Sequence, residues 1–137
     1  MFSRIMVPID LSHADRMGSA LRIAADLATK YGANVTYVAV TAEAPTSVAH
    51  NPEEFETRIQ EFAAAQASEH GIGTDGRSFA STDPAADMDG KLIEAVEKTG
   101  ADLVVMATHA PGLADRLWSG HGAHVATHAR ASVFLVR

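Results

Sequence analysis

Leu103-Val104-Val105-Met106-Ala107 is a short apolar run, followed by a loop of small residues over 108–119 and by a helical stretch from about residue 122. Open α/β sheets hold phosphate groups with this arrangement of strand, loop and helix, because the start of a helix presents unpaired N–H donors and a partial positive charge. The pattern predicts an α/β fold, and it makes nucleotide binding the leading hypothesis.

The rest of the chain continues the same alternation of strands and helices. Apolar or β-branched runs predict strands at residues 5–9, 35–40, 77–81, 102–107 and 132–136. Apolar residues at helical spacing predict helices over about 12–31, 53–71, 84–99 and 122–129. Such alternation requires parallel strands joined by right-handed crossovers. We therefore expect one domain over residues 1–137, a three-layer α/β fold with a five-stranded parallel sheet and helices on both faces.

Composition excludes several classes of function. The 137 residues carry a formal net charge of -6, which argues against a sequence-independent grip on nucleic acid. Cysteine is absent, which excludes disulfides, thiol catalysis and cysteine-ligated metals. No apolar run approaches the ~18 residues of a membrane span, and no cleavable apolar segment precedes the first predicted strand. We expect a cytoplasmic protein that binds neither nucleic acid nor membrane.

The predicted topology brings distant segments of the chain together. In an open parallel sheet, ligands bind beyond the carboxyl ends of the strands, where neighbouring strands send their chains to opposite faces. If the first and fourth strands flank this point, Pro8 to Asp10 and Ala107 to Ser119 converge on one crevice. The two halves of the predicted site then come from opposite ends of the sequence.

Three motifs resemble those of the universal stress protein family. They are Val7-Pro8-Ile9-Asp10-Leu11-Ser12, the run from Ala101 to His109, and Thr127-His128-Ala129 ahead of the last strand. The resemblance covers the whole chain. It implies an adenine nucleotide alpha hydrolase-like fold with strand order 3-2-1-4-5. It also implies a nucleotide-binding stress-response regulator or sensor that acts by binding rather than by turnover.

The glycine motif of ATP-binding family members is only partly present. That motif is a glycine, two residues, a second glycine, nine residues, and a glycine followed by serine or threonine. Here Ala107 and Ala110 stand at the first two glycine positions, Gly120 at the third and His121 at the hydroxyl position. Alanine tolerates close approach but disfavours positive φ, so weaker rather than abolished binding is expected.

Two details of the alignment leave alternatives open. Anchored on Thr127-His128-Ala129, the alignment places Ser119-Gly120 at the glycine–hydroxyl pair, in swapped order. The run His109-Ala110-Pro111 is similar to that of a bacterial subgroup whose members lack the early glycines and are nevertheless associated with ATP.

The resemblance assigns roles to individual residues. It implies that Asp10 and the backbone of Val40 surround the adenine and ribose, with Met106 packed nearby. It implies that phosphates meet the N–H groups of Gly120, His121 and Gly122, with a hydroxyl from Ser119 or Thr108. The ligand would be ATP, ADP or AMP, with or without Mg²⁺. The complete candidate set is Pro8, Ile9, Asp10, Val40, Met106, Ala107, Thr108, His109, Pro111, Gly112, Ser119, Gly120, His121 and Gly122.

Structural roles compete with these assignments. Asp10 also fits a helix cap, a role worth about 1 kcal/mol. His121, His124 and His128 would share one helical face, a spacing compatible with metal ligands, but histidines also occupy solvated helix faces, and we predict no metal site. A protonated His121 beside a triphosphate would make binding sensitive to pH.

Catalysis is not predicted beyond slow ATP hydrolysis or self-phosphorylation. The sequence contains neither a Gly-x-Ser-x-Gly elbow nor a Walker-type Gly-Lys-Ser. The apolar last strand at 132–136 would be an exposed edge, so we expect a homodimer through this strand. The alternative function is a homodimeric scaffold that has lost ATP binding and works through an unknown protein partner.

Overall fold

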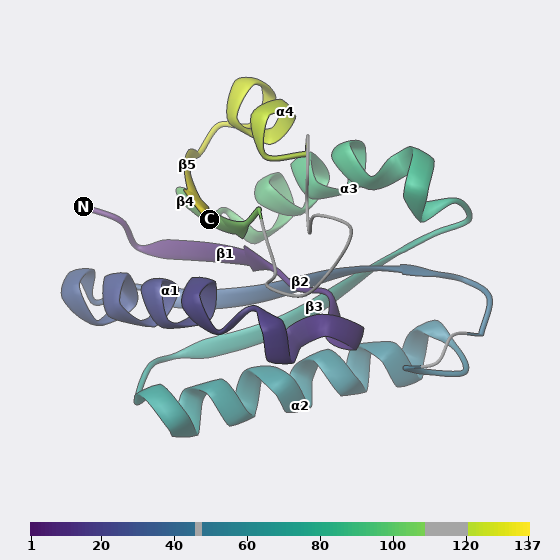
Figure 1. Cartoon of the computed structure of the whole chain (residues 1–137), viewed down its shortest axis with the longest axis horizontal. Helices are drawn as coiled ribbons and strands as arrows, with labels where there is room; N and C mark the ends of the chain where they lie inside the picture. Colours follow the sequence, from purple (N-terminus) through teal and green to yellow (C-terminus); the bar gives the residue numbers. More distant parts are fainter. Residues whose placement is uncertain (46–47, 109–120) are drawn as a thin grey trace.

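The computed structural model describes residues 1–45, 48–108 and 121–137. A five-stranded sheet in the order β3-β2-β1-β4-β5 lies between two layers of helices (Figure 1). All neighbouring strands are parallel. The predicted fold class and the order 3-2-1-4-5 are confirmed.

The strands lie close to their predicted positions. Their bounds are β1 Arg4–Pro8, β2 Asn34–Ala42, β3 Thr74–Ser81, β4 Leu103–Ala107 and β5 Ser132–Val136. Strand β3 begins three residues earlier than the predicted 77–81, and β2 continues two residues beyond the predicted 35–40. Both extensions belong to one ladder, in which Ala42 of β2 still pairs with Ser81 of β3.

The helices cover the two faces of the sheet in pairs. Their bounds are α1 Gly18–Tyr31, α2 Pro52–His70, α3 Pro84–Thr99 and α4 His121–His128. Helices α1 and α2 lie on one face, while α3 and α4 lie on the other (Figure 1). Within the described residues, no helix combines the length and the apolar character that crossing a membrane requires.

The first helical segment differs from the prediction. A continuous helix was expected from about residue 12, but the chain first forms a 3₁₀ helix, η1 (Leu11–Arg16), and α1 begins only at Gly18. The side chain of Asp10 caps η1 by accepting a hydrogen bond from the Ser12 N–H. His13 then has non-helical backbone angles, φ -130° and ψ 19°, which interrupt a regular helical path.

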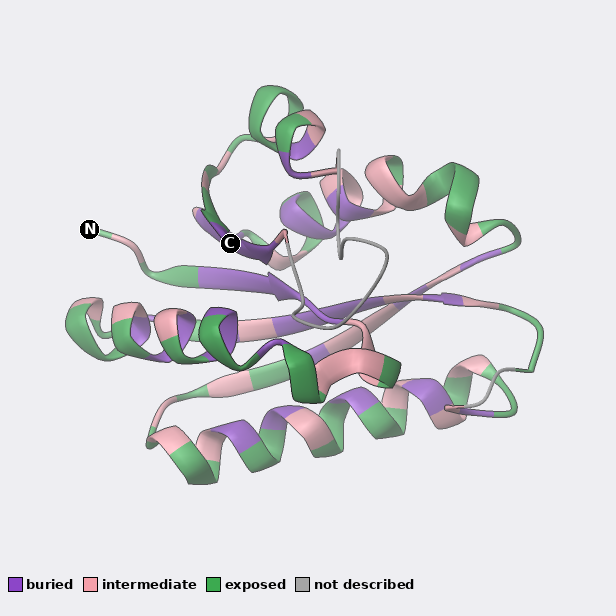
Figure 2. Cartoon of the chain, viewed as in Figure 1, coloured by how far each residue is buried: buried purple, intermediate pink, exposed green. Residues whose placement is uncertain are grey.

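The core follows the predicted apolar pattern. Every residue of β4 is buried, and in β1 only Arg4 is exposed (Figure 2). Helix α2 buries Phe55, Ile59 and Ala63 against the sheet, as their helical spacing predicts. Because the two central strands are covered on both faces, their carboxyl ends are held in fixed positions at one edge of the sheet.

Strand β1 marks the switch point of this sheet. From β1 the chain proceeds outward through α1 to β2 and through α2 to β3, and it then crosses over by α3 to β4 on the other side of β1. Helices α1 and α4, which follow β1 and β4 in the sequence, diverge to opposite faces of the sheet (Figure 1). This divergence leaves room for a ligand between the two strand ends.

Candidate functional site

Asp10 lies just beyond the end of β1, at the carboxyl edge of the sheet. The strand ends at Pro8, and the N–H of Ile9 donates to the carbonyl of Val38 on β2 at 2.7 Å. Ile9 is buried, whereas Asp10 is only half-buried. Asp10 is therefore the first side chain after β1 that an incoming molecule can reach.

Local donors hold the carboxylate of Asp10. Its Oδ1 accepts hydrogen bonds from the Ser12 N–H at 3.1 Å and from the Ser12 hydroxyl at 2.6 Å. Its Oδ2 lies 2.8 Å from Nδ1 of His13. Burial raises the pKa of Asp10, but the hydrogen bonds from Ser12 and His13 and the charge of His13 together lower it below its ordinary value. Asp10 is thus both the cap of η1 and an ionised acceptor at the predicted site.

The end of β4 lies at the same edge. Met6 of β1 pairs with Val104 of β4, so that Pro8 and Met106, each two residues further on, lie at the same level. On the other side of β1, Pro8 pairs with Val38, and Val40 lies two residues further along β2. The structure therefore brings together the predicted residues from the ends of β1, β2 and β4.

Thr108 has a structural role at the end of β4. Its N–H donates to the carbonyl of Val136 on β5 at 2.8 Å, and its hydroxyl donates to the same oxygen at 3.1 Å. A phosphate needs a donor, and the hydroxyl proton of Thr108 is already used within the sheet. This arrangement does not favour the predicted role of the Thr108 hydroxyl toward phosphate.

The first residues of α4 are tied to neighbouring elements. Nδ1 of His121 is within hydrogen-bonding distance of Oδ1 of Asp89 on α3. The next residue, Gly122, is buried, and a Cβ at this position would lie 2.5 Å from Cδ2 of Leu135 on β5. The His121 ring is thus held by α3, and Gly122 allows α4 to approach β5 closely. Backbone N–H groups in this first helical turn remain suited to an anion.

Five of the predicted site residues lie outside the described part of the chain. They are His109, Pro111, Gly112, Ser119 and Gly120. Their assignment to nucleotide binding stays a prediction.

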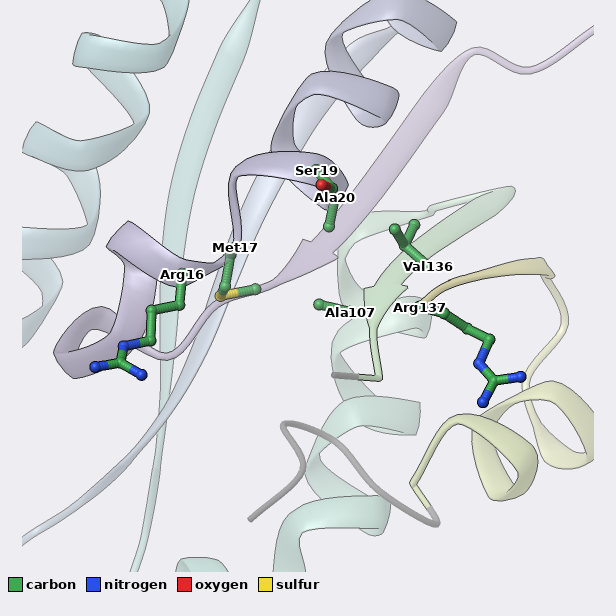
Figure 3. A pocket seen from close by; sticks show the side chains of 7 residues that line it. All are labelled: Arg16, Met17, Ser19, Ala20, Ala107, Val136 and Arg137. Atoms are coloured by element: carbon green, nitrogen blue, oxygen red, sulfur yellow. The ribbon is translucent and has the colours of Figure 1, made fainter. Parts of the chain in front are cut away.

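A pocket of about 310 Å³ opens beside the end of β4, on the α1 side of the sheet (Figure 3). Its lining residues come from the start of α1 and from the ends of β4 and β5, and they are Arg16, Met17, Ser19, Ala20, Ala107, Val136 and Arg137. Of these, the sequence predicted only Ala107 as a site residue. Arg16 and Met17 were missed because the 3₁₀ turn that places them at the sheet edge was not foreseen.

The pocket has an apolar floor and cationic residues at its margins. Met17, Ala20, Ala107 and Val136 are buried. The side chains of Arg16 and Arg137 extend away from each other at opposite sides (Figure 3). In a chain of net charge -6, this position of two guanidinium groups favours anionic ligands near the carboxyl ends of the strands.

The histidines of α4 contact other groups in the described structure. In the described ranges of the chain, no three histidine, aspartate or glutamate side chains are arranged to hold a metal ion. The rings of His124 and His128 instead stack with their centroids 4.1 Å apart. Nδ1 of His124 lies 3.8 Å from Oδ2 of Asp89, the carboxylate that also contacts His121.

A family model matches the chain over its whole length. The model describes the universal stress protein family, and it matches residues 1–137. No curated protein sequence matches the chain.

Solved structures of universal stress proteins share the fold. A protein of this family from Burkholderia pseudomallei has a TM-score of 0.67 and 21% identity, covering 98% of this chain and 95% of that one. The Archaeoglobus fulgidus protein in complex with dAMP has a TM-score of 0.69 and 17% identity, covering 98% of each chain. An Arabidopsis thaliana family protein with AMP bound has a TM-score of 0.61 and 15% identity, covering 98% and 90%.

Proposed function

The chain belongs to the universal stress protein family, and we propose that it binds an adenine nucleotide at the edge formed by the carboxyl ends of β1, β2 and β4. The observation that carries this proposal is the convergence of Asp10 and Met106 across the β1–β4 switch point. The structures of family members with dAMP and AMP bound support the choice of an adenine nucleotide.

Each part of the nucleotide has a chemically suitable neighbour. Asp10 is an ionised acceptor, and a ribose hydroxyl is a donor. The resemblance places the adenine at the backbone of Val40, with the fully buried side chain of Met106 packed nearby. The first N–H groups of α4, at His121 and Gly122, offer donors and the positive end of the helix dipole to phosphates. These residues form a site that recognises charge at one end and shape at the other.

We propose that the protein responds to the nucleotide by binding it, as a sensor or regulator in a stress response. A serine is activated for catalysis when one ring nitrogen of a histidine contacts its hydroxyl and an acid orients the other ring nitrogen. The described residues contain no such arrangement. Turnover would at most be slow hydrolysis or self-phosphorylation. With ATP or ADP, Mg²⁺ would be held chiefly by the phosphates and water, as is usual for this cation.

Isothermal calorimetry tests the proposal with ATP, ADP and AMP, each with and without Mg²⁺. Asp10→Asn keeps an acceptor oxygen for the η1 cap and removes the negative charge. Weaker nucleotide binding by this variant would therefore measure the contribution of the charged carboxylate. Asp26→Ala, at an exposed position of α1, is the matched control and is expected to bind as the wild type does. Nucleotide at about 100 times its Kd should also stabilise the fold by about 2.7 kcal/mol. Absence of binding by the wild-type protein contradicts the proposal.

The second candidate function is a homodimeric scaffold, and the observation that favours it is the exposed edge of the sheet at β5. Phe134 and Leu135 each keep 43% of their surface exposed, and residues 132–136 carry no charge. At the other edge, Glu56 of α2 accepts the N–H of Ser78 on β3 at 2.7 Å and so blocks part of that strand. Pairing of β5 with β5 of a second copy would cover the apolar edge.

The two candidates give different results in the same experiments. A nucleotide sensor binds nucleotide whether or not it dimerises. A scaffold that has lost binding dimerises and shows no heat of binding and no thermal shift at millimolar ATP. A protein that stays monomeric at high concentration would exclude the homodimeric scaffold.

A further inference from the structure

We propose that His13 is a positioning residue for Asp10, holding its carboxylate so that one acceptor position remains for a ribose hydroxyl of the ligand. This inference rests on the proposed function, and it adds a residue and a basis for selectivity. The motif at the end of β1 contains Asp10 and Ser12, and it does not include the next residue, His13. His13 enters the site only through the 3₁₀ turn that the structure shows.

His13 is bonded to Asp10 twice. Its backbone N–H donates to the carbonyl of Asp10 at 3.0 Å, and its Nδ1 lies 2.8 Å from Oδ2 of Asp10. Because an ionised carboxylate only accepts hydrogen bonds, Nδ1 is the donor in this contact. The two bonds close a compact ring, which fixes the imidazole beside the carboxylate.

The contact with His13 restricts a rotation that Ser12 alone leaves open. Ser12 donates twice to Oδ1 of Asp10, from its N–H and from its hydroxyl. The final torsion of an aspartate side chain has a broad energy minimum. A carboxylate that is held at one oxygen can therefore still rotate and move its Oδ2. The donor from His13 holds the second oxygen and defines the plane of the group.

The selectivity for a ribose hydroxyl follows from the number of acceptor positions left on the Asp10 carboxylate. A carboxylate has about four lone-pair positions. Ser12 occupies two on Oδ1, and His13 occupies one on Oδ2, so one remains. The Asp10 side chain keeps 35% of its surface exposed, which makes this position reachable from outside. A single oriented acceptor suits one hydroxyl donor, and ribose supplies such a donor whereas a dideoxyribose does not.

Calorimetry with AMP and with its dideoxy form, which lacks both ribose hydroxyls, tests this role. In His13→Ala we expect AMP to bind about five- to tenfold more weakly, the size of the effect of an ordinary hydrogen bond, because the acceptor for the ribose is no longer held in place. Binding of dideoxy-AMP should not change. His13→Asn should restore AMP binding, because the asparagine Nδ2 takes the place of the imidazole Nδ1 and can donate. His70→Ala, at the far end of α2, is the control and should leave both ligands unaffected.

A measurement without ligand checks the contact itself. Titration of the Asp10 carboxyl by NMR should show a higher pKa in His13→Ala than in the wild type, because a donor that favours the ionised form is lost. An unchanged Asp10 pKa would overturn the positioning role, whether or not nucleotide binds.

The outcomes separate this inference from the proposed function. Equal weakening of AMP and dideoxy-AMP in His13→Ala would assign His13 a purely structural role and overturn the inference alone. Unchanged AMP binding in that variant would do the same. Failure of the wild-type protein to bind either nucleotide would overturn the proposed function and, with it, the selectivity argued from Asp10.

Discussion

The carboxylate of Asp89 on α3 is paired with the imidazole of His121, the first residue of α4. The sequence alone suggested that His121 faces a triphosphate, but its ring is engaged by another helix. The second oxygen of Asp89 lies 3.8 Å from Nδ1 of His124, one turn further along α4. Asp89 therefore ties the first turn of α4 to α3, and this is the turn whose N–H groups we assign to phosphate.

We predict that Asp89→Asn loosens α4. The contact is partly exposed, so its loss should lower the free energy of unfolding by only about 0.5 kcal/mol. Backbone hydrogen exchange in α4 should become faster, because the tie to α3 is weakened. Urea unfolding and exchange measured by mass spectrometry check both effects, with Glu97→Gln on the exposed side of α3 as the control. Unchanged exchange in α4 would show that Asp89 does not hold this helix.

We predict that the free energy of unfolding falls at acid pH, in part because of Asp102. Its carboxylate accepts hydrogen bonds from the N–H and the hydroxyl of Ser3 and from the N–H of Arg4, at 2.9 to 3.1 Å. Burial raises the pKa of Asp102, but these hydrogen bonds outweigh it and lower the pKa below the ordinary value. A lowered pKa in the folded state stabilises the fold above the unfolded-state pKa, near about pH 4, and this stabilisation is lost as the pH falls through the folded-state pKa.

The variant Asp102→Ala tests this dependence. At pH 7 it should lower the free energy of unfolding by about 1 kcal/mol, since three donors lose their acceptor. The deficit should begin to shrink as the pH falls below about 4, where the carboxyl group of the unfolded chain takes up a proton, and it should vanish below the lowered folded-state pKa. Denaturant unfolding across this pH range measures the deficit, and Asp26→Ala is the control. A deficit that is the same at acid and neutral pH would contradict the assigned role.

The order of strands and the core positions could be predicted from the sequence because they depend on long, regular patterns. The alternation of apolar runs with helical spacings fixes a parallel sheet, and β1 and β4 show the continuous apolar character of strands covered on both faces. The start of the first helix could not be predicted in the same way. It depends on hydrogen bonds among Asp10, Ser12 and His13, and these bonds leave no periodic pattern in the sequence.

We predict that Tyr37→Phe does not destabilise the protein. Tyr37 is fully buried on β2, and among the described residues its hydroxyl has no hydrogen-bond partner. Burial, with a contribution from the charge of Glu69, raises the pKa of Tyr37 to about 12. Removing an unpaired buried hydroxyl should change the free energy of unfolding by between zero and about 1 kcal/mol in the stabilising direction. Thermal unfolding checks the sign, and a clear loss of stability would reveal a partner for this hydroxyl.

We predict that Phe134→Arg prevents self-association. The substitution places a charge on the exposed apolar edge strand β5, where two copies would otherwise pair. Light scattering after size exclusion should then report a dimer for the wild type and a monomer for the variant. Ala64→Arg, which adds the same charge at an exposed position of α2, should leave the dimer intact. Dimers of unchanged stability in Phe134→Arg would place the interface elsewhere.

The candidate site shows which features a sequence can reveal. The convergence of the ends of β1 and β4, with Pro8 to Asp10 and Ala107, follows from the strand order and was predicted. The pairing of His121 with Asp89 joins residues from two helices whose relative rotation depends on packing, and no local motif encodes it. The use of the Thr108 hydroxyl by β5 is hidden for the same reason, because the acceptor is a backbone oxygen 28 residues away.

Hydrogen exchange with and without saturating AMP tests the location of the nucleotide site most directly. Bound AMP should slow exchange in the segments that meet at the carboxyl edge, which are residues 9–13, 40–42, 106–108 and 121–124. Exchange at the opposite edge, including the start of β1, should not change. Binding without protection in these segments, or with protection confined to the pocket between α1 and β5, would contradict a site at the β1–β4 switch point.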